Sequence, residues 1–416
     1  MTGIDYRIGD TRDVTENIKT GSVSLVATSP PFLALRSYLP ADHPDKHAEI
    51  GSEPDPATFI DTLLGLTAEW GRVLAPWGSI AIELGDTYSG SSMTGGDDNG
   101  SERYPGGRSS VQAIHAPKRG GAWPMPKSLA LIPQLYAIAL AYGRNPLTGA
   151  ESPAGRWRVR NVIVWQRPNP AVGALGDKFR PSTSYIVVAT RDAKRWFDLT
   201  AVRGDLKAPE ARNVPRAGTQ LEANGGRLHT MGNYTAAMSA GAPPLDCWFD
   251  EWDGHDTWTV TTQPSKLAHY AMWPAKLAER LVLSMCPAEV CSACGEPRRR
   301  VEHAANSVGK AVRSRNEGRG GRTDCLVSSA GPQVSDMVTT GWTDCGCGAP
   351  WTPGTVLDPF AGTGTTLAVA NLHGRNAIGI DVDARNRDLL APRTAEVKRN
   401  LFGTPLPKAN QLEFTL

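Results

Sequence analysis

The stretch VLDPFAGTGTTLAVANLHGRNAIGIDVD, Val356–Asp383, decides the fold of this 416-residue chain. An apolar run leads into a glycine-rich turn, a helical stretch follows, and a second apolar run ends at Asp381. This order is typical of a nucleotide-binding βαβ unit. Gly362 and Gly364 allow a sharp turn and a close approach of backbone to ligand, and Asp381 can accept hydrogen bonds from ribose hydroxyls. A tight turn without a ligand is the alternative for the glycine pattern taken alone.

Short apolar runs alternate with helical periodicity along much of the chain, which predicts an α/β fold with a mostly parallel, doubly wound sheet. Strands are expected at Tyr6–Ile8, Ser24–Ala27, Ser79–Glu83, Val159–Trp165, Ser184–Ala189, Thr355–Leu357 and Ala377–Ile380. Helices are expected at Thr58–Val73, Ser128–Ala141, Pro274–Ser284 and Thr365–His373. Tyr88–Ala122 and Leu199–Asp246 lack apolar periodicity and are expected to be loop-rich insertions.

The composition constrains the class of protein more than its partners. Lys and Arg total 44 against 42 Asp and Glu, so the net charge of +2 predicts no global attraction to nucleic acid. One segment, Gly295–Arg322, is basic and is either a phosphate contact or a solvated face. There is no apolar run of about 18 residues, and MTGIDYRIGD lacks the regions of a secretory signal. We therefore expect a soluble cytoplasmic protein with no membrane partner.

Four of the seven cysteines occur in two short pairs, Cys291-x-x-Cys294 and Cys345-x-Cys347. Four thiolates in such pairs are suited to one tetrahedral zinc ion with a structural role. The alternative is a set of reduced thiols in a loop, because the second pair is more tightly spaced than a standard knuckle. A disulfide framework is not expected in a cytoplasmic chain of this size.

A second candidate site follows the apolar run Leu25–Ala27, where Thr28 is succeeded by Ser29-Pro30-Pro31-Phe32. The prolines stiffen the turn and lack N–H groups, so nearby carbonyls are presented outward as acceptors. Standing alone, this pattern would be read as a strand followed by a Pro-Pro turn.

The two patterns together resemble the β-class amino-methyltransferases of DNA, in which TSPPF-like and DPFAGTGTT-like motifs occur in this order. Further stretches fit that family: Gly9-Asp10, Glu83–Asp86, Asn161–Pro170 and HYAMWPAKLAERL at His269–Leu281. The resemblance covers about three fifths of the chain and leaves the insertions aside. It implies a Rossmann-like methyltransferase fold that binds S-adenosylmethionine.

The resemblance also implies roles for individual residues. Ser29 and the Pro30 carbonyl would orient and polarise an exocyclic amine, Pro31 would stiffen the turn, and Phe32 would stack on a base swung out of the duplex. The residues expected to hold the cofactor are Asp10, Thr28, His269, Asp358, Phe360, Gly362, Gly364, Thr365 and Asp381.

The family pattern associates Ser-Pro-Pro mostly with N4 of cytosine and Asp-Pro-Pro with N6 of adenine. We therefore expect methylation of cytosine N4 in double-stranded DNA, with adenine N6 as the alternative. A DNA-binding protein that keeps the fold without catalysis is the alternative from another class. A restriction endonuclease counterpart is a candidate partner, and the oligomeric state stays open.

The resulting domain plan alternates methyltransferase core with insertions. Core segments are expected at 1–87 (the catalytic half), 123–198, 251–290 (the cofactor-side helix) and 348–400 (the cofactor-binding βαβ unit). Insertions are expected at 88–122, as a candidate DNA contact, at 199–250, as a candidate target-recognition segment, and at 291–347, as the cysteine-bounded segment that could bind zinc. Residues 401–416 would form a tail.

Overall fold

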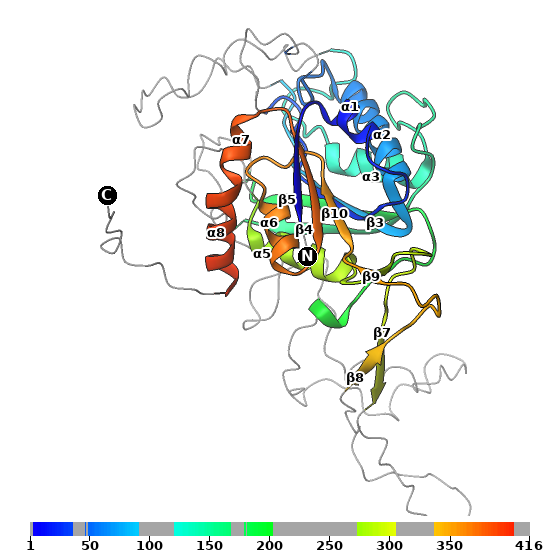
Figure 1. The fold of residues 1–416 in the computed structure, drawn as a ribbon. Helices are drawn as coiled ribbons and strands as arrows, with labels where there is room; N and C mark the ends of the chain where they lie inside the picture. The colour runs from blue at the N-terminus through cyan, green and yellow to red at the C-terminus, as the bar shows by residue number, and fades with distance from the viewer. Residues whose placement is uncertain are drawn as a thin grey trace, which may run out of the picture. The chain divides into compact units, whose positions relative to one another are not determined.

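In the computed structural model, the core of the chain is one seven-stranded sheet (Figure 1). In sheet order the strands are β1 (Ile4–Ile8), β11 (Asn376–Asp381), β10 (Thr355–Asp358), β2 (Val23–Thr28), β3 (Leu74–Leu84), β5 (Thr183–Thr190) and β4 (Arg158–Gln166). The first five are parallel to their neighbours, and β5 pairs antiparallel with β3 and β4. The structure describes residues 3–35, 46, 49–90, 120–167, 179, 181–202, 273–304 and 337–402.

Helices cover both faces of this sheet (Figure 1). One face carries α1 (Thr11–Glu16), α2 (Pro56–Val73) and α3 (Ile132–Tyr142). The other face carries α5 (Ala275–Met285), α6 (Thr365–Leu372) and α8 (Leu390–Phe402). The short α7 (Arg385–Asp388) precedes α8 in the chain. Side chains of a strand alternate between faces, so Val26 packs in the first core whereas Leu25 and Ala27 pack in the second. Both faces of β2 are buried, and its centre is the apolar run Leu25–Ala27 with buried Ser24 and Thr28 on either side.

The strand order places strands from the N-terminal and C-terminal parts of the sequence beside each other. Leu25 of β2 is paired with Val356 of β10, and Val26 with Leu357. From β10 the chain proceeds to β11 on one side, whereas from β2 it proceeds to β3 on the other. The sheet therefore has a topological switch point between β2 and β10, and ligands of open α/β sheets bind at the carboxyl ends of the strands at such a point.

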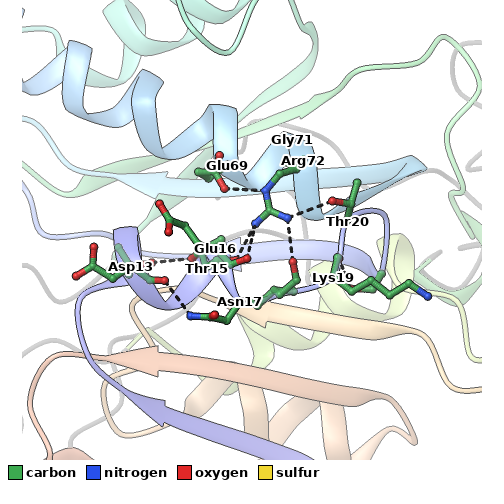
Figure 2. A network of polar contacts seen from close by, with 12 residues as sticks. Asp13, Thr15, Glu16, Asn17, Lys19, Thr20, Glu69, Gly71 and Arg72 are labelled. Carbon is green, nitrogen blue, oxygen red and sulfur yellow. Dashed lines mark hydrogen bonds and ion pairs between the residues drawn. The ribbon is translucent and has the colours of Figure 1, made fainter.

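A polar network fastens the loop between α1 and β2 to the end of α2 (Figure 2). The Arg72 guanidinium donates to the Thr15 carbonyl at 2.8 Å and the Ile18 carbonyl at 2.9 Å, and it pairs with Glu69 at 2.8 Å. The Thr20 hydroxyl accepts a further bond from the same guanidinium at 3.2 Å. One cation thus satisfies carbonyls at the end of α1, where helix backbone acceptors lack partners.

The chain divides into two compact units, one comprising residues 1–198, 245–298 and 345–416 and the other 199–244 and 299–344. Described elements of the second unit are the 3-10 helix η2 (Thr200–Val202) and the antiparallel pair of β7 (Arg300–Ala304) with β8 (Met337–Trp342). The first unit also contains the short antiparallel pair of β6 (Val290–Cys291) with β9 (Trp351–Thr352). No helix within the described ranges is long and apolar enough to cross a membrane.

The expected α/β fold with a mostly parallel sheet is confirmed, and every expected strand is present. The helix expected from Ser128 was wrong at its start, because α3 begins only at Ile132. There, the Asp86 carboxylate accepts the N–H groups of Leu131 and Ile132, and Leu131 adopts a left-handed conformation that ends the preceding turn. The short α1 and the C-terminal α8 were not expected.

Candidate active site

The Ser-Pro-Pro-Phe turn leaves the carboxyl end of β2 at the switch point. Ser29 is half-buried, and its hydroxyl donates a short hydrogen bond to Glu83, which lies near the end of the neighbouring strand β3. Only 3% of Glu83 is exposed. With its proton directed toward a carboxylate, the Ser29 oxygen keeps its lone pairs for a ligand and becomes a better acceptor.

Phe32 is held by close packing against the backbone of Gly85. A Cβ atom on Gly85 would lie 2.6 Å from Cε2 and 2.8 Å from Cδ2 of the ring, so only glycine fits there. The ring is half-buried, whereas Pro30 between it and β2 is buried. The Phe32 ring, three residues after Ser29, is therefore held in one place and is partly exposed. Stacking on a base would require both properties.

The glycine turn after β10 is tied to two neighbouring strands. The Gly362 N–H donates to Asp381 Oδ2 at 2.8 Å, and the Gly362 carbonyl accepts the Tyr6 hydroxyl at 2.6 Å. Gly364, the N-cap of α6, has φ +84°, and a Cβ there would lie 2.3 Å from Leu390 Cδ1. Burial, followed by the charges of nearby aspartates including Asp381, raises the pKa of Tyr6, so its hydroxyl stays a donor.

Asp381 ends β11 and organises the backbone around it. Besides the Gly362 N–H, its carboxylate accepts the Asp383 N–H at 2.8 Å and the Asn386 side-chain amide at 3.0 Å. These contacts fix the orientation of the Asp381 carboxylate at the carboxyl ends of the parallel strands. Its expected bond to ribose hydroxyls stays a prediction.

Asp10 follows β1 and begins α1. Its carboxylate accepts the Arg12 N–H at 2.8 Å as the helix N-cap and pairs with the Arg12 guanidinium at 2.5 Å. Despite the opposing effect of burial, these bonds to Arg12 lower the pKa of Asp10. Gly9 donates its N–H to the Asp381 carbonyl at 2.9 Å, which joins the ends of β1 and β11.

A buried carboxylate joins the two sequence motifs. Asp358, the last residue of β10, accepts the Thr28 hydroxyl at 2.6 Å and the Phe360 N–H at 3.1 Å. Burial raises the pKa of Asp358 from 3.8 to about 6, although hydrogen bonds from Thr28 and Thr366 act in the opposite direction. Phe360 is half-buried and packs against the first core.

Thr365, in the first turn of α6, faces a buried arginine. Its hydroxyl accepts the Arg393 Nε–H at 2.9 Å, and Arg393 pairs with Glu396 at 2.9 Å. The Trp273 indole donates to the Thr366 hydroxyl at 3.2 Å. These contacts fasten the start of α6 to α8 and to Trp273, which lies two residues before α5. The expected role of Thr365 in holding a cofactor stays a prediction, and His269 lies outside the described residues.

The four paired cysteines also come together, with their sulfur atoms all within 4.8 Å of one another: Cys291, Cys294, Cys345 and Cys347. This cysteine cluster could hold a metal ion. It belongs to the first unit, at the pair of β6 with β9.

Comparison with known proteins identifies the family. The family model described as DNA methylase matches residues 23–289 and 352–391, which together form most of the chain. The chain belongs to the DNA methylase family. The matched ranges include the Ser-Pro-Pro-Phe turn, Glu83 and the glycine turn. They exclude the whole cysteine-bounded segment and all but the first two residues of α8.

Individual relatives are distant except over short stretches. The chain is 27% identical to the Type II methyltransferase M.SfiI of Streptomyces fimbriatus over 210 residues, which make up 50% of this chain and 41% of that protein. It is 24% identical to M.Cfr9I of Citrobacter freundii over 284 residues, 68% of this chain and 73% of that one. Over 45 residues, 11% of this chain and 12% of the relative, it is 53% identical to M.HinfI of Haemophilus influenzae. The chain thus spans less than half the length of M.SfiI.

Among solved structures, PvuII DNA methyltransferase (cytosine-N4-specific) aligns with a TM-score of 0.47 and 13% identity. The alignment covers 97% of this chain and 94% of that one.

Three residues at the site had no role assigned from the sequence: Tyr6, Glu83 and Arg393. Glu83 carries the clearest signal, because a charged residue ends a buried apolar run in β3. Tyr6 is the buried residue of β1, in phase with Ile4 and Ile8, and Arg393 is a buried cation in a helix that also carries Lys398 and Arg399. Their partners are distant in sequence, so no local pattern identifies them.

Proposed function

We propose that this chain transfers a methyl group from S-adenosylmethionine to the N4 amino group of cytosine in double-stranded DNA. The observation that carries the proposal is the hydrogen bond from the Ser29 hydroxyl to Glu83 at the switch point, next to the glycine turn of β10. A neutral hydroxyl whose proton is committed to a carboxylate is an acceptor suited to an exocyclic amine, which offers only N–H groups in the base plane.

The residues at the carboxyl ends of β1, β10 and β11 fit the proposed cofactor. Gly362 and Gly364 have positive φ and form the sharp turn after β10, and Asp10 and Asp381 supply acceptors for amino and hydroxyl groups. S-adenosylmethionine supplies an electrophilic methyl group attached to a sulfonium. No metal takes part in this reaction.

An amine that receives this methyl group in exchange for the sulfonium's carbon–sulfur bond would have to lose one proton. Ser29 and the Pro30 carbonyl accept the two amine hydrogens, which localises the nitrogen lone pair and aligns it for transfer. The departing proton passes to the Ser29 oxygen as the Ser29 hydroxyl proton passes to Glu83. Phe32 stacks on the base, which must leave the duplex to reach the turn.

The choice of cytosine over adenine is supported by the residue that begins the turn. Serine stands where an aspartate would supply a formal charge for adenine N6. The family matched by the chain includes both kinds of amino target. The relatives named above are Type II methyltransferases, which supports a restriction endonuclease as the counterpart of this chain in its host.

Nucleoside analysis tests the proposal directly. The chain is expressed in a host that lacks DNA methylation, and its DNA is digested to nucleosides and analysed by mass spectrometry. We expect N4-methyldeoxycytidine, and much less of it in cells carrying Ser29→Ala at the same expression level. Detection of N6-methyldeoxyadenosine alone would overturn the choice of base. Absence of both, from protein that binds S-adenosylmethionine and DNA, would overturn the activity and favour a non-catalytic DNA-binding role.

A further inference from the structure

The cysteine cluster lies outside the machinery proposed for methyl transfer. We propose that it binds one Zn²⁺ through all four thiolates, as a closed structural site. A zinc–sulfur bond of about 2.3 Å places tetrahedral sulfur ligands about 3.8 Å apart. The four sulfur atoms already lie within 4.8 Å of one another, so a small contraction completes the site.

The backbone around each cysteine pair donates hydrogen bonds to the sulfurs and turns sharply after the pair. The N–H groups of Ala293 and Cys294 donate to the Cys291 sulfur, and the Cys347 N–H donates to the Cys345 sulfur. Such bonds stabilise the negative charge that a metal-bound thiolate carries. Each pair is followed by a glycine in the left-handed region, Gly295 with φ +72° and Gly348 with φ +65°. These turns fold each pair back on itself, so that both of its sulfurs point to one place.

The cluster stands on a fixed support rather than on a free loop. The indole of Trp77 donates to the Gly295 carbonyl at 3.0 Å, and the indole of Trp196 donates to the Arg298 carbonyl at 2.7 Å. Trp77 and Trp196 are buried together in a small apolar cluster. The Ser292 N–H also donates to the Pro350 carbonyl at 3.0 Å, which joins the first cysteine turn to the second.

The ligand set favours zinc over the alternatives. Four soft thiolates select zinc or iron–sulfur chemistry over magnesium or calcium, and four protein ligands leave no open position for catalysis. All four sulfurs converge on one point, which a pair of disulfides would not require.

The site would connect two distant parts of the chain. Cys294 and Cys345 flank residues 295–344, most of which belong to the second unit. A metal bound by both pairs therefore closes this long loop at its base. Closing a long loop restricts the unfolded chain, so the ion adds stability without touching the methyl-transfer residues.

Metal content of the purified full-length protein tests the proposal, whether or not it methylates DNA. We expect one zinc per chain by elemental analysis, and a native mass equal to the chain plus one Zn²⁺ in place of two protons. Replacing zinc with Co²⁺ should give the absorption bands of a tetrahedral tetrathiolate. Cys347→His should keep the metal while weakening the sulfur-to-cobalt band, because a histidine nitrogen replaces one thiolate.

The matched control is Cys325→Ser, which changes a cysteine of the same segment outside the cluster and should leave zinc content unchanged. The double variant Cys294→Ser/Cys347→Ser should lose the ion, with circular dichroism reporting whether the main fold persists. Wild-type protein without stoichiometric zinc, with iron in its place, or with disulfides joining these cysteines would overturn the proposal. Zinc retained by a folded double variant would overturn it equally.

Discussion

The hydroxyl of Thr28 donates a 2.6 Å hydrogen bond to the carboxylate of Asp358, across 330 residues of sequence. Both residues end parallel strands that are neighbours in the sheet, and both are buried. This bond joins the turn that would hold the base to the turn that would hold the cofactor. The positions of two candidate half-sites are thereby coupled through one buried contact.

The Ser29 hydroxyl should be required for methyl transfer but not for cofactor binding. Ser29→Ala removes an acceptor that acts on the amine as it reacts, so we expect kcat to fall about 100- to 1000-fold. Its Kd for S-adenosylmethionine, measured by calorimetry, should change by no more than about twofold, since that residue would touch the base. Ser22→Ala, which changes an exposed serine bonded to the Lys19 carbonyl, is the control. Equal activity of the two variants would contradict the role of Ser29.

Glu83 should act through Ser29. Glu83→Gln keeps an acceptor for the Ser29 hydroxyl and removes the charge that receives its proton. We expect a fall of about 100-fold in single-turnover rate, with KM for DNA little changed. In the double variant Ser29→Ala/Glu83→Gln the losses should not add, because the carboxylate has no hydroxyl left to polarise. Additive losses of rate would show that Glu83 acts independently of Ser29 and would contradict this prediction.

Substitutions at two glycines with left-handed backbones should distinguish the cost of conformational strain from the cost of close packing. Gly364 has φ +84° and a Cβ there would lie 2.3 Å from Leu390, whereas Gly374 has φ +74° and open space around it. Gly374→Ala should cost about 1–2 kcal/mol of unfolding free energy from strain alone. Gly364→Ala should cost about 1–3 kcal/mol more, because overpacking is added. Equal losses in urea unfolding would show that Leu390 can move aside.

Asp358 should make stability depend on pH. Folding raises the pKa of its carboxyl from 3.8 to about 6, so between these values the folded state holds a proton that the unfolded state has lost. The contribution of Asp358 to the unfolding free energy therefore falls as pH rises through this window, by at most about 3 kcal/mol. Asp358→Asn keeps an acceptor oxygen and lacks this titration. Relative to wild type it should gain stability between pH 4 and pH 7, and a constant difference would contradict the shift.

Arg72 should stabilise the first unit through the network in Figure 2. Arg72→Met leaves the Thr15 and Ile18 carbonyls without this donor, and about 1–2 kcal/mol of unfolding free energy should be lost. The loss is moderate because 30% of the side chain is exposed, so water can replace part of the network. Lys19→Met, at an exposed position of the same loop, should change stability by less than about 0.5 kcal/mol.

The sequence alone determined the sheet, its glycine turn and the Ser-Pro-Pro-Phe turn. Apolar runs such as Leu25–Ala27 must be buried on both faces, which predicts parallel strands covered by helices. Gly362 and Gly364 predicted a turn that only residues without a Cβ form easily, and both have positive φ. These features depend on backbone preferences and local periodicity, which neighbouring residues in the chain are enough to specify.

Only the tertiary structure decided which distant groups meet. It joined Ser29 to Glu83 and the Tyr6 hydroxyl to Gly362, whereas the meeting of the two cysteine pairs was already expected from their spacing. It also placed the start of α3 at Ile132, where Asp86 from another element accepts the first helix N–H groups. Such partners are set by strand order and burial, which are properties of the whole packed chain, and no pattern within one segment contains them.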